Sequence, residues 1–180
     1  MRALAPAALP LGAQDPSGVV VAQAFDDRLF QLLEAGGKVL LLPDGKRHSF
    51  PLDEHWFLRG GPYISTHQLL NLIPRELLVE TQAFDLAGPV IPDVGYLQQV
   101  DPIVMLWDTH DIERVKTHGL LFETRVGKGK LMVSALRHDG PANAAGRWLL
   151  DVFVNYLQTG SKPKNSMPIA VLRQEVDKAR

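Results

Sequence analysis

The side chains best suited to chemistry gather in two short segments of the sequence, residues 107–111 (WDTHD) and 137–139 (RHD). Each segment follows an apolar run that reads as a strand, so we expect both at or just beyond strand ends, where ligand crevices form in α/β sheets. Carboxylates and imidazoles beside an aromatic ring can hydrogen-bond sugar hydroxyls while the ring packs on the apolar sugar face. The candidate ligand-binding residues are therefore Trp107, Asp108, His110, Asp111 and His138.

A structural interpretation of the same residues competes with this one. Strand-end Asp and His side chains commonly satisfy backbone groups in loops, and Trp107 would then belong to the core. The sequence favours this structural interpretation over a ligand site.

Metal binding has little support in the sequence. His110, Asp111, His118 and His138 could supply ligands, but no HExxH motif, EF-hand loop or short paired His spacing accompanies them. The chain has no cysteine, which excludes disulfides, thiolate nucleophiles and Cys-ligated zinc. We therefore expect neither a metal nor a cofactor site.

A catalytic centre is equally hard to find. No Gly-x-Ser-x-Gly elbow occurs, and Ser134 falls inside a predicted strand where a nucleophile would be buried. Glu123, with Glu80 or Asp85, could in principle form a carboxylate pair, but Glu123 is expected to face solvent beside a cross-strand Lys or Arg. We therefore assign no catalytic residue.

The composition narrows the class of protein. The 180 residues are 46% hydrophobic and 22% charged, with a net charge of -1, which suits one globular domain. This near-neutral balance gives no electrostatic reason to expect nucleic acid or an anionic membrane as a partner. No apolar run is long enough to span a bilayer, and prolines interrupt the first residues too often for a signal peptide, so the compartment stays open.

The elements that must position the candidate residues begin with a βαβ unit. Residues 18–23 and 38–42 are β-branched or apolar runs typical of buried strands, and a helix between them starts at the N-cap Asp26 and ends at Gly36-Gly37. Such a unit implies parallel neighbouring strands and an α/β fold.

A hairpin and a helix follow in the second half of the chain. Apolar residues alternate along residues 120–126, Gly127 and Gly129 suit the positive φ angles of a hairpin turn, and residues 131–136 form an apolar strand. Because a strand follows it, this glycine-rich turn is not a phosphate loop. Helical spacing then continues to Leu157.

These segments resemble a known family. The sequence GLLFETRVGKGKLMVSALRHDGPANAAGRWLLDVFVNYL, preceded by DPIVMLWDTHD and LLEAGGKVLLLPDG, resembles the glutamine-amidotransferase-like domain near the C-terminus of many bacterial glycoside hydrolase family 2, β-galactosidase-like proteins. The resemblance extends from about Val19 to Leu157. It implies a flavodoxin-like, class I amidotransferase-like domain: a mostly parallel sheet with helices on both faces and an antiparallel hairpin at one edge.

The resemblance also implies a function. An active class I amidotransferase uses a Cys nucleophile that this chain lacks, and the paired carboxylates of the parent glycosidases lie in a separate barrel that 180 residues of this pattern cannot contain. We therefore expect a non-catalytic accessory domain of a glycoside hydrolase, serving architecture, oligomerisation or carbohydrate contact. Its implied partners are other domains of a longer hydrolase or a second copy of the chain, with carbohydrate as a further candidate. The resembled proteins are often exported.

We expect three parts in the chain: a lead-in or linker (1–17), the α/β domain (18–158) and an extension with a helix (159–180). The short lead-in suggests a fragment of a longer protein. The aromatic, basic segment 55–63 suits either a sugar platform or, as we prefer, a surface that packs against a neighbouring domain. Two alternatives stay open: a small hydrolase or ligand-binding protein with a site around His110, Asp111 and His138, and a protein-interaction module that uses the surface of residues 56–63.

Overall fold

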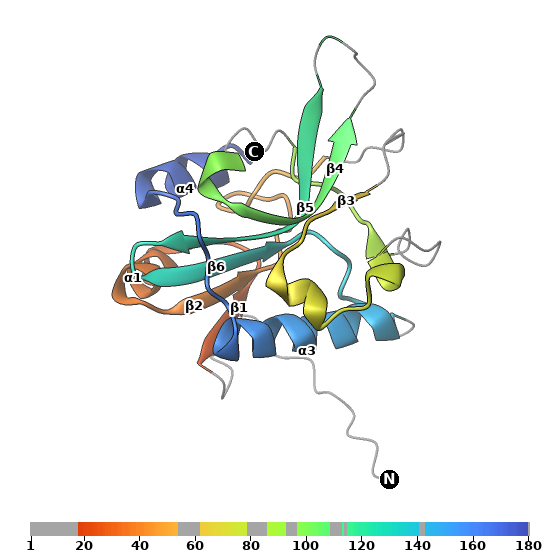
Figure 1. The fold of residues 1–180 in the computed structure, drawn as a ribbon. Helices are drawn as coiled ribbons and strands as arrows, with labels where there is room; N and C mark the ends of the chain where they lie inside the picture. The colour runs from red at the N-terminus through yellow and green to blue at the C-terminus, as the bar shows by residue number, and fades with distance from the viewer. Residues whose placement is uncertain are drawn as a thin grey trace.

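The computed structural model describes residues 18–53, 62–78, 86–92, 97–108, 113, 115–140 and 143–179, and these form a six-stranded sheet with packed helices (Figure 1). The strands are β1 (Val19–Ala22), β2 (Lys38–Leu41), β3 (Pro62–Ile64), β4 (Asp101–Asp108), β5 (Lys116–Val126) and β6 (Gly129–Ser134). The helices are α1 (Asp27–Ala35), α3 (Ala144–Thr159) and α4 (Ile169–Val176), with 3₁₀ turns η1 (Gln68–Asn71), η2 (Arg75–Leu78) and η3 (Leu97–Gln99). The order across the sheet is β1-β2-β6-β5-β4-β3.

The sheet is mixed, so the prediction of a mostly parallel, flavodoxin-like sheet is wrong. β1 pairs with β2 and β2 pairs with β6 in parallel, whereas the β6–β5, β5–β4 and β4–β3 pairs are antiparallel. The fold is α/β, but the parallel βαβ pattern of its first strands does not continue. The later strands instead form an antiparallel meander from β3 to β6.

The hairpin of β5 and β6 lies in the middle of the sheet, not at its edge as predicted. β6 pairs with β2 on its outer side, and β5 pairs with β4. An edge strand would leave one row of backbone groups unpaired. β5 is also buried continuously from His118 to Thr124. This stretch includes Glu123, which was expected to face solvent but is covered by His67, Tyr156 and Ser161.

The predicted βαβ unit is confirmed. Asp26 caps α1 by accepting a hydrogen bond of 2.8 Å from the backbone N–H of Leu29, and Gly36 ends the helix with φ of 106°. Phe25 and Phe30 stack at 4.9 Å across the helix start, as in a hydrophobic staple. These local contacts direct β2 alongside β1.

The two glycines of the hairpin turn have different roles. Gly127 has φ of 59°, which is the conformation expected at the first turn position of a type II′ hairpin. Gly129 does not have positive φ, contrary to the prediction. It is instead the point of closest approach to α1: a Cβ atom there would lie 2.5 Å from the Leu33 carbonyl oxygen and 2.6 Å from that of Gly37.

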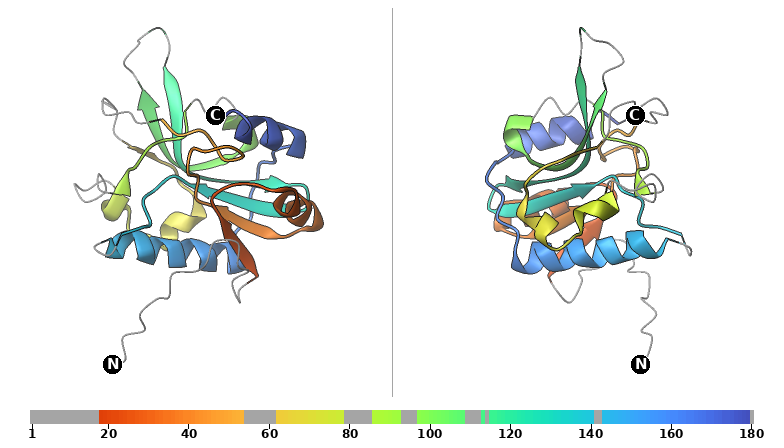
Figure 2. Two further views of the ribbon diagram at one scale, coloured as in Figure 1. Left: turned by 180° about the vertical axis from the view of Figure 1, so that it is seen from behind. Right: turned by 45° about the vertical axis from the view of Figure 1, so that its right-hand side comes forward.

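Helices cover the two faces of the sheet. Successive residues of a strand point to opposite faces. In β6, Gly129 faces α1, whereas Ser134 lies on the opposite face and contacts His138, which packs against Phe153 of α3. Figure 2 shows α3 running along one side of the sheet and α4 on the other. The predicted terminal helix is confirmed as α4, which buries Leu172 and Val176.

Candidate functional site

Of the predicted ligand-binding residues that the structure describes, Trp107 and Asp108 lie apart from His138. Trp107 and Asp108 end β4 and pair with Thr117 and Lys116 of β5, in a two-stranded ribbon that projects away from α3 (Figures 1 and 2). His138 lies beside α3 instead, because its ring bonds to Gly146 and packs on Phe153. His110 and Asp111 lie outside the described residues. Even Trp107 and Asp108 point to opposite faces of the ribbon, since they are consecutive in a strand.

Ser134 and His138 form a pair that resembles a nucleophile and its base. The Ser134 hydroxyl lies 2.8 Å from His138 Nε2, and His138 Nδ1 lies 2.8 Å from the Gly146 carbonyl oxygen. Because only Nδ1–H can donate to that carbonyl, Nε2 is left to accept from the serine. Ser134 is only 1% exposed, however, so a substrate cannot reach its oxygen, as the sequence analysis predicted.

The environment of His138 favours its neutral form. Burial lowers the pKa of His138, and the bond to Gly146 and the nearby Asp139 carboxylate only partly oppose this effect. The neutral imidazole can make both hydrogen bonds, with Nδ1–H donating to the Gly146 carbonyl and Nε2 accepting from the Ser134 hydroxyl.

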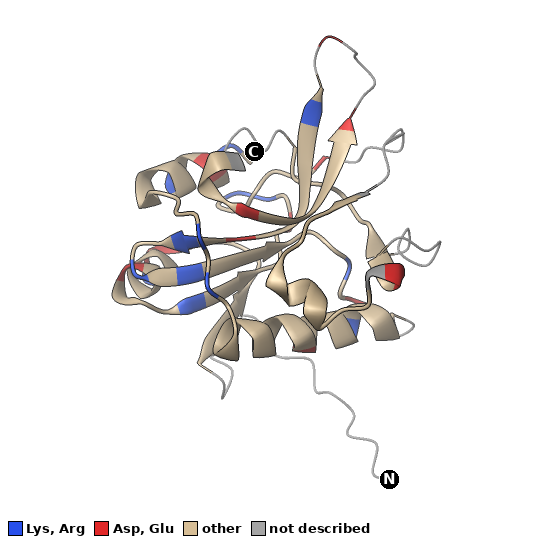
Figure 3. Ribbon diagram, viewed as in Figure 1, with Lys and Arg blue, Asp and Glu red and all other residues tan. Residues whose placement is uncertain are grey.

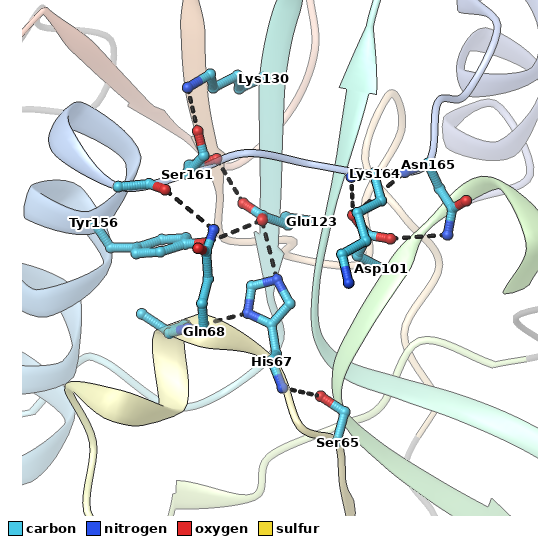
Figure 4. A network of polar contacts seen from close by, with 12 residues as sticks. Ser65, His67, Gln68, Asp101, Glu123, Lys130, Tyr156, Ser161, Lys164 and Asn165 are labelled. Atoms are coloured by element: carbon cyan, nitrogen blue, oxygen red, sulfur yellow. Dashed lines mark hydrogen bonds and ion pairs between the residues drawn. The ribbon is translucent and has the colours of Figure 1, made fainter.

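A second polar network is centred on Glu123, whose side chain is fully buried in β5 (Figure 4). Its Oε1 accepts hydrogen bonds from His67 Nε2 and from the Tyr156 hydroxyl, both at 3.0 Å. Its Oε2 accepts one of 2.6 Å from the Ser161 hydroxyl. The three donors come from the segment before η1, from α3 and from the segment after α3, so the carboxylate joins three distant parts of the chain to β5.

The His67 and Tyr156 side chains that donate to Glu123 also accept hydrogen bonds from neighbouring residues. His67 Nδ1 accepts from the backbone N–H of Leu69 at 3.3 Å, and the Tyr156 oxygen accepts from Gln68 Nε2 at 2.8 Å. Burial and the Glu123 charge raise the pKa of Tyr156 far above its usual value, so the phenol stays protonated. This network resembles a catalytic centre in composition, but its bonds hold the fold together.

A second set of hydrogen bonds, centred on Asp101, holds the segment that joins α3 to α4. The buried Asp101 carboxylate accepts from the backbone N–H groups of Lys164 and Asn165 and, at 2.8 Å, from the Asn165 side chain. Asn165 also donates to the Val100 carbonyl at 2.9 Å. This segment therefore lies firmly against the start of β4.

Basic residues gather at one end of the sheet (Figure 3). Lys38, Lys130 and Arg125 are direct cross-strand neighbours on β2, β6 and β5. Lys38 Nζ donates to the Gln158 carbonyl at 3.0 Å, and Lys130 Nζ donates to the Ser161 carbonyl. Cations at the C-terminus of a helix offset its negative dipole end, so two of these three residues stabilise the end of α3.

The ribbon carries an exposed aromatic pair, of which the sequence indicated only Trp107 as a candidate ligand-binding residue. Tyr63 of β3 and Trp107 of β4 have ring centroids 5.8 Å apart and planes inclined by 19°. Trp107 is 47% exposed, so it is not a core residue. The sequence places Tyr63 only within the aromatic segment 55–63, because Trp107, its neighbour in space, lies far away in the sequence.

Among the residues that the structure describes, no group of three or more His, Cys, Asp or Glu side chains could hold a metal ion. No helix in the same part of the chain is long and apolar enough to cross a membrane.

Residues 61–177 match a family described as a domain of unknown function, DUF8487. The chain belongs to the DUF8487 family. The DUF8487 region contains the aromatic pair, the Glu123 network and the Ser134–His138 pair, and it leaves out β1, α1 and β2. No curated protein matches the chain.

Proposed function

We propose that this DUF8487 chain is a non-catalytic accessory domain of a glycoside hydrolase, serving architecture and carbohydrate contact. The observation that carries the proposal is the complete burial of Glu123, the centre of the network that resembles a catalytic centre in composition, against three structural donors. A general acid or base must come within hydrogen-bond reach of its substrate, and a carboxylate enclosed in this way cannot.

The Ser134–His138 pair, the other combination of side chains that could act in catalysis, supports the same proposal. Ser134 is buried in β6, and His138 is turned toward it and toward Gly146 rather than toward solvent. The alternative of a small independent hydrolase built on His110, Asp111 and His138 stays a prediction, because His110 and Asp111 lie outside the described residues. The hydrolase parentage rests on the resemblance carried by residues 119–157.

The test is a hydrolysis assay of the purified chain. We expect it to release no galactose from a chromogenic β-galactoside and no ammonia from glutamine above the buffer control, while an active β-galactosidase and an active glutaminase serve as positive controls. Release that disappears in the Glu123→Gln or Ser134→Ala variant, with the melting temperature preserved, would contradict the proposal.

A second experiment tests the parentage. We expect the DNA adjoining the coding region to encode a barrel domain with paired carboxylates, either in the same reading frame or next to it. Adjoining genes without any carbohydrate-active domain would remove the glycoside hydrolase from the proposal, while leaving the conclusion on catalysis intact.

A further inference from the structure

The aromatic pair lies at the sheet edge that β3 forms. Tyr63 is directly opposite Met105 in the β3–β4 register, and Trp107 follows two residues later on the same face of β4. Tyr63 is 48% exposed and Trp107 is 47% exposed. The nearly parallel rings are stacked on each other and both side chains are about half exposed; we call this exposed pair the Tyr63–Trp107 platform.

The nearest described strand neighbours of the platform carry no charge. These are Met105, Thr117 and Gly119, which share its face in the pairing of β3, β4 and β5. Asp108 and Lys116, the charged neighbours, pair with each other one position further along and therefore point to the opposite face of the ribbon. The hydrogen-bonding groups available beside the rings are therefore the Tyr63 hydroxyl, the Trp107 indole N–H and the Thr117 hydroxyl.

The size of the platform argues for a small ligand. A buried aromatic side chain covers roughly 150–250 Å², so two half-exposed rings present about 200 Å² in total. A stable protein interface needs roughly 800 Å² from each partner. A surface of this size suits one or two sugar rings, whose apolar C–H faces stack on aromatic rings while their hydroxyls reach polar groups at the edges.

We propose that the Tyr63–Trp107 platform binds a neutral saccharide by stacking. Because the nearest described neighbours Met105, Thr117 and Gly119 carry no charge, an anionic or cationic ligand would find no counter-charge among them, which favours a neutral ligand. The inference rests on the proposed accessory function for its biological setting, and it names the ligand class and the residues of the carbohydrate contact.

The experiment is a calorimetric binding titration of the full chain with neutral oligosaccharides. The three ligands are a β-galactooligosaccharide, cellotetraose and xylotetraose. We expect at least one to bind, and Trp107→Ala to weaken its affinity by up to about tenfold, since one aromatic contact contributes up to about a factor of ten. Tyr63→Ala should weaken it to a similar extent. Trp107→Phe should retain part of the affinity because it keeps a ring.

Trp148→Ala is the matched control. Trp148 is 41% exposed and lies on α3, away from the platform, so its removal should leave binding unchanged. Thermal melting of each variant shows that loss of binding is not loss of folding.

The proposal is overturned if none of the three saccharides binds at millimolar concentration. It is also overturned if Trp148→Ala weakens binding as much as Trp107→Ala, or if Trp107→Ala disrupts a concentration-dependent dimer that no saccharide affects. Saccharide binding that depends on Trp107, in a chain that also hydrolyses glycosides, would refute the accessory function and leave this platform intact.

Discussion

Glu123 connects more separate segments than any other residue in the described polar networks. Its carboxylate accepts from His67, Tyr156 and Ser161, which lie 56, 33 and 38 positions away in the sequence. A buried donor that loses its acceptor costs about 1–3 kcal/mol, so the three donors make this site sensitive to substitution.

Removal of this acceptor should destabilise the fold. We expect Glu123→Ala to lower the free energy of unfolding by about 3 kcal/mol or more, and Glu123→Gln by less, because an amide oxygen can still accept. Urea denaturation followed by circular dichroism measures the change. Glu34→Ala, on the exposed side of α1, should stay within about 0.5 kcal/mol of the wild type. Equal effects of the Glu123→Ala and Glu34→Ala substitutions would contradict a structural role for the carboxylate.

His138 should make stability depend on pH. Its pKa is lowered in the folded protein, so the unfolded chain takes up the proton first as the pH falls below about 6.5. Stability contributed by the neutral ring is therefore fully present at neutral pH and is lost as the pH falls from about 6.5 through the folded pKa. We expect the free energy of unfolding to decrease between pH 7 and pH 5.5, and His138→Gln to flatten that decrease.

Ser134→Ala is the control for this experiment, since it removes the hydroxyl partner of the ring and keeps the imidazole. It should lower the overall stability and retain the pH slope. A slope unchanged in His138→Gln would show that other groups cause it.

At the scale of elements, the hairpin turn packs closely against α1 at Gly129. A Cβ atom on Gly129 would lie 2.8 Å from the Leu33 Cα atom as well as close to two carbonyl oxygens, and all three are backbone atoms that cannot rotate away. The helix and the hairpin must separate to admit even a methyl group.

Gly129→Ala should therefore be costly. We expect a loss of about 2–3 kcal/mol in the free energy of unfolding, as for other overpacked sites. The neighbouring Lys128→Ala, on the exposed side of the same turn, should change it by less than about 0.5 kcal/mol. Thermal or urea unfolding of the two variants gives the comparison, and a fully stable Gly129→Ala protein would show that α1 moves freely against the turn.

The elements could be predicted where their signals are local. The Asp26 cap, the Gly36 stop and the turn at Gly127 each depend on residues a few positions apart, and each was found from the sequence. The position of the hairpin in the sheet was not predictable, because strand order depends on pairings such as that of Lys38 with Lys130.

In the candidate site too, features with local sequence signals could be predicted, whereas contacts between distant segments could not. Trp107 could be proposed from its place at a strand end, but its neighbour Tyr63 comes from a different strand, and the burial of Glu123 depends on three remote donors. The regular alternation of β5 predicted one buried face, whereas helices and turns from elsewhere cover both. No local pattern encodes that cover.

At the scale of the whole molecule, the residues that match DUF8487 include only part of the sheet. The match begins at residue 61, yet β1, α1 and β2 lie earlier and pack against β6 and α3. Without them, the fully buried strand β6 would lose its pairing with β2, and α3 would lose part of its packing surface.

A fragment of residues 61–177 should therefore not fold alone. We expect it to show little cooperative melting and poor dispersion of its amide signals in NMR spectra, whereas the whole chain should melt cooperatively. Mixing the fragment with a separate peptide of residues 18–53 tests whether the missing pairing is the cause, since partial recovery of structure is then expected. A well-dispersed spectrum of the fragment alone would show that the DUF8487 region is independent of the first strands.

The central place of the hairpin has a consequence for the order of folding. Val126 pairs with Gly129 across the shortest possible loop, whereas β2 can meet β6 only after a long intervening segment has been closed. Loop closure costs more entropy as the loop lengthens, so β5 and β6 should form the nucleus, with β4 and β2 added to its two open sides. Substitutions inside the hairpin should then slow refolding, while those in β1, at the far edge, should mainly speed unfolding.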